Sequence, residues 1–262
     1  MKKTNNKTVS KKREVYSDDS DDEDEILNLY ELEMIKPFLV SYDNPNYDEK
    51  KFPLKHPFMG ALIGSTGSGK TNILGDMIDK FHGTFHKIYV FCANKDEPIY
   101  RMLEHVIPDR DLFEVFEGYD KVEEFDFDNN LFGQSLLVFD DFVTIKDQSK
   151  IENLYTRARK LGDGGASCLY LSQSFFDTPL MIRKNCRYIF LKMINNTNDM
   201  NLILRDCGIE GDKRSLDNMF NYCVKNQHDI RNMLFIDRSA DKTKRYRKNY
   251  KKILNIDDFK KK

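Results

Sequence analysis

Residues 64–71 (GSTGSGKT) carry the strongest chemical signal in this sequence, because they match the pattern G-x-x-x-x-G-K-[ST] of a phosphate-binding loop. Glycines let backbone N–H groups turn inward around a phosphate, Lys70 can reach the β- and γ-phosphates, and Thr71 can offer its hydroxyl to Mg²⁺. An apolar run precedes the motif and a helical pattern follows it, as this loop requires. The residues expected to bind the nucleotide are Gly64, Ser65, Thr66, Gly67, Ser68, Gly69, Lys70 and Thr71.

A second, acidic element lies at residues 136–141 (LLVFDD), where four apolar residues run into Asp140 and Asp141. A buried strand that ends in carboxylates places them at the sheet edge where Mg²⁺ would sit. We predict that Asp140 joins Thr71 in the magnesium shell, through a water molecule, and that Asp141 polarises the attacking water. The alternative is a helix that starts at Asp141, where an acid favours the helix dipole.

Three further polar residues are candidates for a role in turnover. Gln173 ends the apolar run 167–173 and could sense the γ-phosphate, although an ordinary strand-end hydrogen bond explains it nearly as well. Arg157 and Arg159 lie two positions apart in a helical pattern, so they point about 200° away from each other. At most one of them can face a given partner, either as an arginine finger for a neighbouring subunit's nucleotide or as part of a solvated basic face.

Short apolar runs alternate along the chain with amphipathic helical patterns. The predicted strands are residues 58–64, 87–93, 112–118, 135–141, 167–173, 187–193 and 233–238. The predicted helices are residues 69–82, 97–106, 149–161, 178–184, 198–206 and 213–225. This alternation predicts an α/β fold of three layers, with a mostly parallel central sheet flanked by helices. Ligands of such sheets bind at the carboxyl ends of the strands.

The net charge of −1, from 42 Lys+Arg and 43 Asp+Glu among 262 residues, conceals charge that is segregated along the chain. Residues 18–25 hold seven acids in eight positions, whereas residues 238–262 hold eleven Lys/Arg and three Asp. We expect an N-terminal segment at 1–50, disordered to about residue 25, then a P-loop domain at 51–237 and a basic tail at 238–262. The tail segment KTKRYRKNYKK could contact a phosphate backbone, serve as a localisation signal or simply be solvated.

Composition also bears on the compartment. The five cysteines are scattered and form no CxxC pair, so neither a disulfide framework nor a zinc site is indicated. No apolar run approaches the roughly 18 to 20 residues of a membrane helix, and no apolar stretch follows the N-terminal charges. We therefore expect a protein without a membrane span that is not secreted.

Several motifs, taken in their order and spacing, resemble the poxvirus-type genome-packaging ATPases, the viral branch of the FtsK–HerA superfamily. They lie between about residues 54 and 195, and they are the loop GSTGSGKT, the strand LLVFDD, the helix TRARKLG, the strand SCLYLSQSF and the segment PLMIRKN. The resemblance implies a RecA-like P-loop NTPase core with an extra strand between the two Walker strands. It also implies a homo-oligomeric ring that hydrolyses ATP with Mg²⁺ and moves double-stranded DNA into a capsid, in the virus factory of the host cytoplasm or in the virion.

The resemblance assigns roles to Lys70, Thr71, Asp140, Asp141 and Gln173, and to either Arg157 or Arg159. Many cellular relatives have Glu where this chain has Asp141. Two other functions stay open at this point. One is a P-loop nucleotide kinase, although no arginine-rich lid is obvious in the sequence. The other is a nucleotide-gated capsid-assembly protein without fast turnover, whose acidic head and basic tail serve as docking segments.

Overall fold

The computed structural model of the protein describes residues 28–39, 44, 47, 52–194, 197–206, 212–224 and 231–260. The chain divides into two compact units, Met1–Val40 and Ser41–Lys262. In the first unit, Leu29–Glu31 and Glu33–Phe38 form short 3-10 helices, and the side chain of Asn28 caps the earlier one. The segment expected to be disordered, up to about residue 25, lies outside the described residues.

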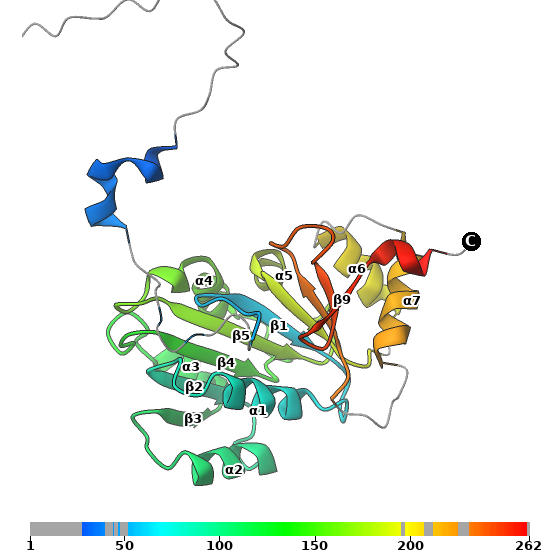
Figure 1. The fold of residues 1–262 in the computed structure, drawn as a ribbon. Helices are drawn as coiled ribbons and strands as arrows, with labels where there is room; N and C mark the ends of the chain where they lie inside the picture. Colours follow the sequence, from blue (N-terminus) through cyan, green and yellow to red (C-terminus); the bar gives the residue numbers. More distant parts are fainter. Residues whose placement is uncertain are drawn as a thin grey trace, which may run out of the picture. The chain divides into compact units, whose positions relative to one another are not determined.

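The second unit is built on a twisted sheet that has nine strands in the described part of the chain, in the order β3-β2-β4-β5-β1-β6-β7-β8-β9 (Figure 1). The strands from β3 to β6 in that order run parallel, and β7, β8 and β9 pair antiparallel. The strands are β1 (Met59–Ile63), β2 (Lys87–Cys92), β3 (Phe113–Glu117), β4 (Ser135–Asp140), β5 (Ala166–Ser172), β6 (Tyr188–Leu191), β7 (Leu234–Asp237), β8 (Tyr246–Lys248) and β9 (Lys252–Leu254).

Helices cover both faces of this sheet. The described helices are α1 (Lys70–Lys80), α2 (Pro98–Val106), α3 (Tyr119–Glu124), α4 (Ser149–Arg157), α5 (Leu180–Asn185), α6 (Thr197–Asp206) and α7 (Lys213–Val224). Helices α1 and α2 contribute buried residues to one apolar cluster, whereas α3 to α7 contribute to the other. The strands between them serve both clusters, because successive side chains of a strand point to opposite faces. In β4, for example, Leu137 and Phe139 join one cluster, and Leu136 and Val138 join the other.

This three-layer arrangement confirms the predicted fold class. Each of the seven predicted strands and six predicted helices corresponds to an observed element, with boundaries that differ by a few residues. Strand β5 lies between β1, which precedes the phosphate-binding loop, and β4, which ends in Asp140. Strand β5 is therefore the extra strand between the two Walker strands that the resemblance implies. None of the described helices is long and apolar enough to cross a membrane.

The sequence patterns do not predict β8 and β9, which lie in the segment that we expected to be a basic tail. Each of these strands has three residues, and together they hold three basic side chains on their six positions. No apolar run marks them, and their order comes instead from a few buried side chains. Tyr246, Tyr250 and Leu254 are at most 7% exposed and pack against the two apolar clusters. The sheet therefore continues past Asp237, where the tail was expected to begin.

Candidate nucleotide-binding site

The phosphate-binding loop connects the carboxyl end of β1 to the first residue of α1. Gly67 and Gly69 take left-handed backbone angles, with φ of 74° and 87°, which only glycine adopts at little cost. Gly64 is needed for space, since a Cβ there would lie 2.5 Å from the Lys192 Cβ and 2.6 Å from the Ser68 Oγ. The Ser65 N–H donates to the Met193 carbonyl at 2.8 Å, which ties the loop to the end of β6.

The interior of the loop has the properties of an anion site. The Ser68 Oγ is buried and has no hydrogen-bond partner among the described residues. The Lys70 ammonium lies folded over the loop, where it donates to the Gly64 carbonyl at 2.8 Å. Burial lowers the pKa of Lys70, while the charges of Asp140 and Asp141 act in the opposite direction. A phosphate group in the loop would supply an acceptor for Ser68 and a counter-charge for Lys70, so these residues fit a nucleotide.

Asp140 is the last residue of β4, and its side chain is almost completely buried, with the residue 5% exposed. One of its carboxylate oxygens accepts a hydrogen bond from the hydroxyl of Tyr100, a fully buried residue of α2. Burial raises the pKa of Asp140 to about 6, and the hydrogen bond from Tyr100 and the charge of Lys70 oppose this rise. Asp140 and Thr71 supply oxygen atoms, which Mg²⁺ prefers as ligands, from β4 and the first turn of α1. The donor chemistry thus fits the predicted metal.

Asp141 does not start a helix, because α4 begins only at Ser149. Its φ of 63° lies in the left-handed region, and this sharp turn after β4 leaves the Asp141 side chain exposed at the sheet edge. Gln173, which follows β5, donates from its Nε2 to the Asp141 Oδ1 at 3.1 Å. The same amide accepts a hydrogen bond at its Oε1 from the Thr66 hydroxyl, also at 3.1 Å. Gln173 therefore connects the phosphate loop to Asp141.

The structure does not bring Arg157 and Arg159 to this edge of the sheet. Helix α4 ends at Arg157, earlier than predicted, and Arg159 lies in the 3-10 turn Ala158–Lys160 that follows. The chain there packs next to the amino end of β4, since Gly162 lies against the backbone of Gly133. Arg157 pairs with Asp128 on the surface, with one of its two contacts at 3.0 Å. Neither arginine faces the phosphate loop of its own chain, and a role in trans stays a prediction.

Sequence reasoning missed two residues of this site. Tyr100 belongs to a correctly predicted helix, but the helical pattern indicates only that its ring is buried, and not that its hydroxyl meets the end of β4. Glu97, just before α2, is half-buried, and its negative charge raises the pKa values of Lys70 and Asp140. A polar atom on a buried helix position was the one signal available for Tyr100, because a buried tyrosine hydroxyl usually has a partner.

The fold and the loop geometry together define a P-loop NTPase with a RecA-like core. The family model described as "Poxvirus A32 protein" matches residues 46–256. The chain therefore belongs to the poxvirus A32 protein family, which confirms the resemblance that the motifs indicate. The match extends through β8 and β9, so these strands are part of the family's domain.

A similar fold occurs in a viral protein of known structure. The genome packaging NTPase B204 from Sulfolobus turreted icosahedral virus 2, in complex with sulfate, aligns with a TM-score of 0.53 and 13% identity. The alignment covers 77% of this chain and 100% of that chain. The same protein in complex with ATP-gammaS has a TM-score of 0.48 and 13% identity, over 76% of this chain and 98% of that chain. At this identity the similarity establishes the fold alone. A search among curated protein sequences finds no match.

Proposed function

We propose that this protein is a Mg²⁺-dependent ATPase that drives the translocation of double-stranded DNA during packaging of a viral genome. The observation that carries the proposal is the convergence of Lys70, Asp140, Asp141 and Gln173 on one edge of the parallel sheet, around a loop shaped for phosphate. Membership of the A32 family and the fold of a packaging NTPase support the viral setting.

The roles follow from the contacts at the site. On ATP binding, Lys70 would exchange the Gly64 carbonyl for the β- and γ-phosphate oxygens, and the N–H groups around Ser68 would surround the β-phosphate. Thr71 and Asp140 would hold Mg²⁺, which neutralises charge on the phosphates. Asp141, held by Gln173, would orient and polarise the attacking water. Phosphoryl transfer needs mainly positioning and charge stabilisation, and these fixed groups supply both.

The proposal also covers partners and location. We expect a homo-oligomeric ring around duplex DNA, with a capsid protein as docking partner, in the virus factory or the virion. In such a ring, Arg157 or Arg159 would reach the nucleotide of a neighbouring subunit. The position of both arginines far from their own phosphate loop agrees with action in trans.

ATPase activity of the purified full chain, measured with and without linear duplex DNA and with particle mass from light scattering, tests this function. We expect an oligomer whose turnover rises with DNA. Lys70→Ala should abolish turnover, whereas Lys184→Ala, which changes an exposed lysine of α5, should leave it unchanged. A monomer with DNA-independent phosphoryl transfer to a mononucleotide would indicate a kinase instead. Nucleotide-dependent association without turnover would indicate an assembly protein.

A further inference from the structure

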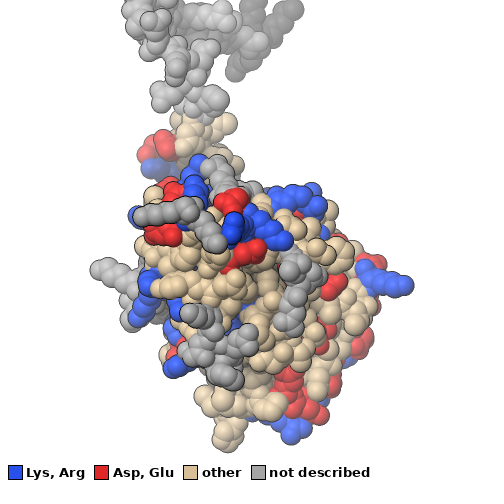
Figure 2. All heavy atoms as spheres, turned by 90° about the vertical axis from the view of Figure 1, so that its right-hand side faces the viewer, with Lys and Arg blue, Asp and Glu red and all other residues tan. Residues whose placement is uncertain are grey.

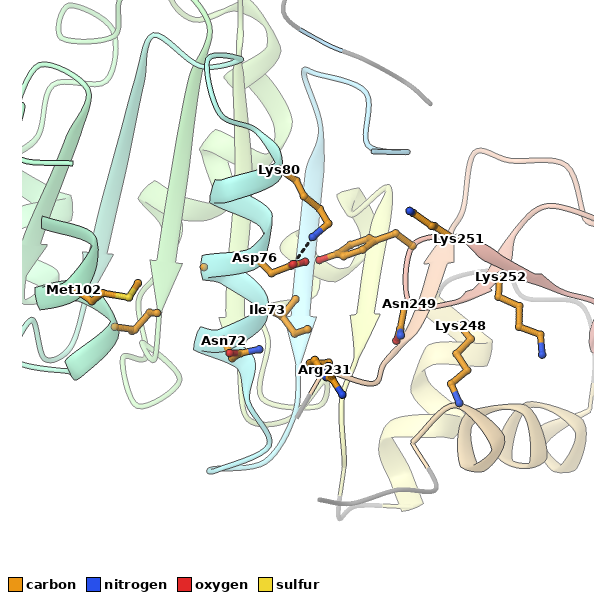
Figure 3. A pocket seen from close by; sticks show the side chains of 13 residues that line it. Asn72, Ile73, Asp76, Lys80, Met102, Arg231, Lys248, Asn249, Lys251 and Lys252 are labelled. Carbon is orange, nitrogen blue, oxygen red and sulfur yellow. Dashed lines mark hydrogen bonds and ion pairs between the residues drawn. The ribbon is translucent and has the colours of Figure 1, made fainter. Parts of the chain in front are cut away.

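A basic groove, distinct from the phosphate loop, runs along the outer side of α1. Its cavity volume is about 990 Å³, and it lies between α1, α2 and the hairpin of β8 and β9. Figure 3 shows Met102 of α2 on one side of the groove and the hairpin on the other. Ile99 of α2 also lines the groove. Along α1 the groove extends from Asn72, next to the phosphate loop, to Lys80. These eight residue steps correspond to about 12 Å of helix.

Positive charge dominates the lining of this groove. Its basic residues are Lys80, Arg231, Lys248, Lys251 and Lys252, and its one acidic residue, Asp76, pairs with Lys80. Figure 3 shows Arg231 and Lys248 at the end of the groove nearest Asn72, and Lys251 at the end nearest Lys80. Figure 2, which faces the right-hand side of Figure 1, shows acidic and basic groups interspersed over the face that it displays.

The hairpin that carries three of these lysines is an ordered element. Tyr250, in its turn, is 7% exposed, and its ring centroid lies 4.6 Å from that of Phe52. Asn249 has a φ of 55°, and its side-chain oxygen accepts a hydrogen bond from the Met233 N–H at 3.0 Å. Rigid placement matters because a preorganised charge loses little entropy when it meets a ligand.

The chemistry of the lining selects a phosphate backbone rather than bases. The Tyr250 ring is buried, so it offers no stacking face to a base. Tyr222, on α7 near the hairpin, already has the ammonium groups of Lys248 and Lys252 at 5.0 Å from its ring. Among the residues that the structure describes, the hydrogen bonds of these ammonium groups go to uncharged oxygens of Tyr222, so no described carboxylate neutralises their charge there.

We propose that this groove binds the phosphate backbone of duplex DNA. The proposal deepens the proposed function and rests on it, since it identifies where the DNA substrate contacts the subunit. A single strand carries one phosphate per about 3.4 Å of duplex axis, so a groove of about 12 Å is long enough to contact more than one successive phosphate. Because α1 is both the floor of the groove and the helix that begins at the phosphate loop, DNA and nucleotide contact the same helix.

The test is the salt dependence of duplex binding by the full chain, measured by fluorescence anisotropy with a labelled 30-base-pair duplex between 50 and 200 mM KCl. The variant is Lys251→Gln with Lys252→Gln, both exposed positions. The matched control is Lys242→Gln with Lys244→Gln, which removes the same charge from the same C-terminal segment outside the groove. ATP hydrolysis without DNA is measured for all three proteins.

Each lysine that contacts a phosphate contributes about 0.9 to the slope of log affinity against log salt. For two lysines, the loss of affinity over this fourfold salt range should be about tenfold smaller in the groove variant, per bound subunit. The control should match the wild type, and hydrolysis without DNA should be unchanged in both. An unchanged slope, or a raised KM for ATP in the groove variant, would overturn the proposal. A wild-type chain that hydrolyses ATP but binds no duplex would refute the DNA partner itself.

Discussion

The hydroxyl of Tyr100 offers the sharpest test of the catalytic geometry. Tyr100→Phe keeps the buried ring and removes only the group that donates to the Asp140 carboxylate. Both residues are almost inaccessible, at 0% and 5% exposed, so water cannot replace the lost donor. A hydrogen bond to a charged group contributes about 1.5–3 kcal/mol. A loss of about 2 kcal/mol lowers the Tm of a domain of this size by about 4–8 °C.

The functional consequence of Tyr100→Phe should exceed this stability loss. The hydrogen bond orients Asp140 and lowers its pKa, so its removal leaves less of the carboxylate form, and in a less defined position. Loss of such a supporting contact typically costs 10- to 100-fold in metal affinity or activity. We therefore expect that ATP hydrolysis, titrated with MgCl₂ at fixed ATP, needs at least tenfold more free Mg²⁺ to reach half-maximal rate.

Tyr155→Phe is the matched control for this experiment. Its hydroxyl is also buried and donates to the Gly60 carbonyl at 2.7 Å, away from the metal-binding residues. Tyr155→Phe should lower the Tm by a few degrees and leave the Mg²⁺ titration unchanged. If Tyr100→Phe behaves in the same way, with a normal Mg²⁺ requirement, the reasoning about Asp140 is refuted.

Three further outcomes are expected. Gln173→Ala should reduce ATP turnover at least tenfold, because Asp141 loses its link to the phosphate loop. A changed Tm with normal turnover would show that Gln173 contributes to stability and not to catalysis. Arg157→Ala and Lys70→Ala should each be inactive alone, yet regain ATPase activity when mixed, since a Lys70→Ala subunit still supplies an arginine to its neighbour. No recovery on mixing would exclude Arg157 from action in trans. His56 is buried with both ring nitrogens hydrogen-bonded, and burial lowers its pKa below 6.5. The unfolded chain then binds more protons below pH 6.5, so this contribution to stability is present above pH 6.5 and is lost as the pH falls toward the lowered pKa. His56→Phe should flatten the decrease in Tm between pH 7 and 5.5, and an equal decrease in both proteins would contradict this origin.

The central parallel strands were predictable because they are apolar on both faces. Strand β4, with all six residues buried, and β5, with all seven, stand out as continuous apolar runs. Strands β8 and β9 were not predictable from the sequence, because their stability depends on tertiary contacts. Tyr246 and Tyr250 become buried only when the hairpin packs onto the sheet and α1. A local pattern of three basic residues in six gives no sign of these contacts.

The residues of the candidate site also divide into those that a local sequence pattern marks and those that tertiary packing places. Lys70, Asp140 and Gln173 each follow an apolar run at its carboxyl end, so the parallel sheet brings them to one edge, and a motif search finds them. Tyr100 contacts Asp140 from a helix 40 positions away in the sequence, through a side chain that composition alone assigns to the core. Arg157 was given a role by its place in a motif, but its position depends on where α4 ends relative to β4, and that is a property of packing.

Truncation of the C-terminal segment cannot separate the effect of its positive charge on DNA binding from its contribution to the stability of the fold. Removal of residues 238–262 would take away the basic groups of the hairpin together with β8, β9 and the buried Tyr250. Burying a large apolar side chain contributes about 1.5–3 kcal/mol, so a truncated chain would lose DNA binding through instability whatever its lysines contact. The exposed Lys251 and Lys252 can be neutralised without touching that core. Point substitutions therefore separate the two roles, and the net charge of −1 is compatible with a local, basic DNA contact.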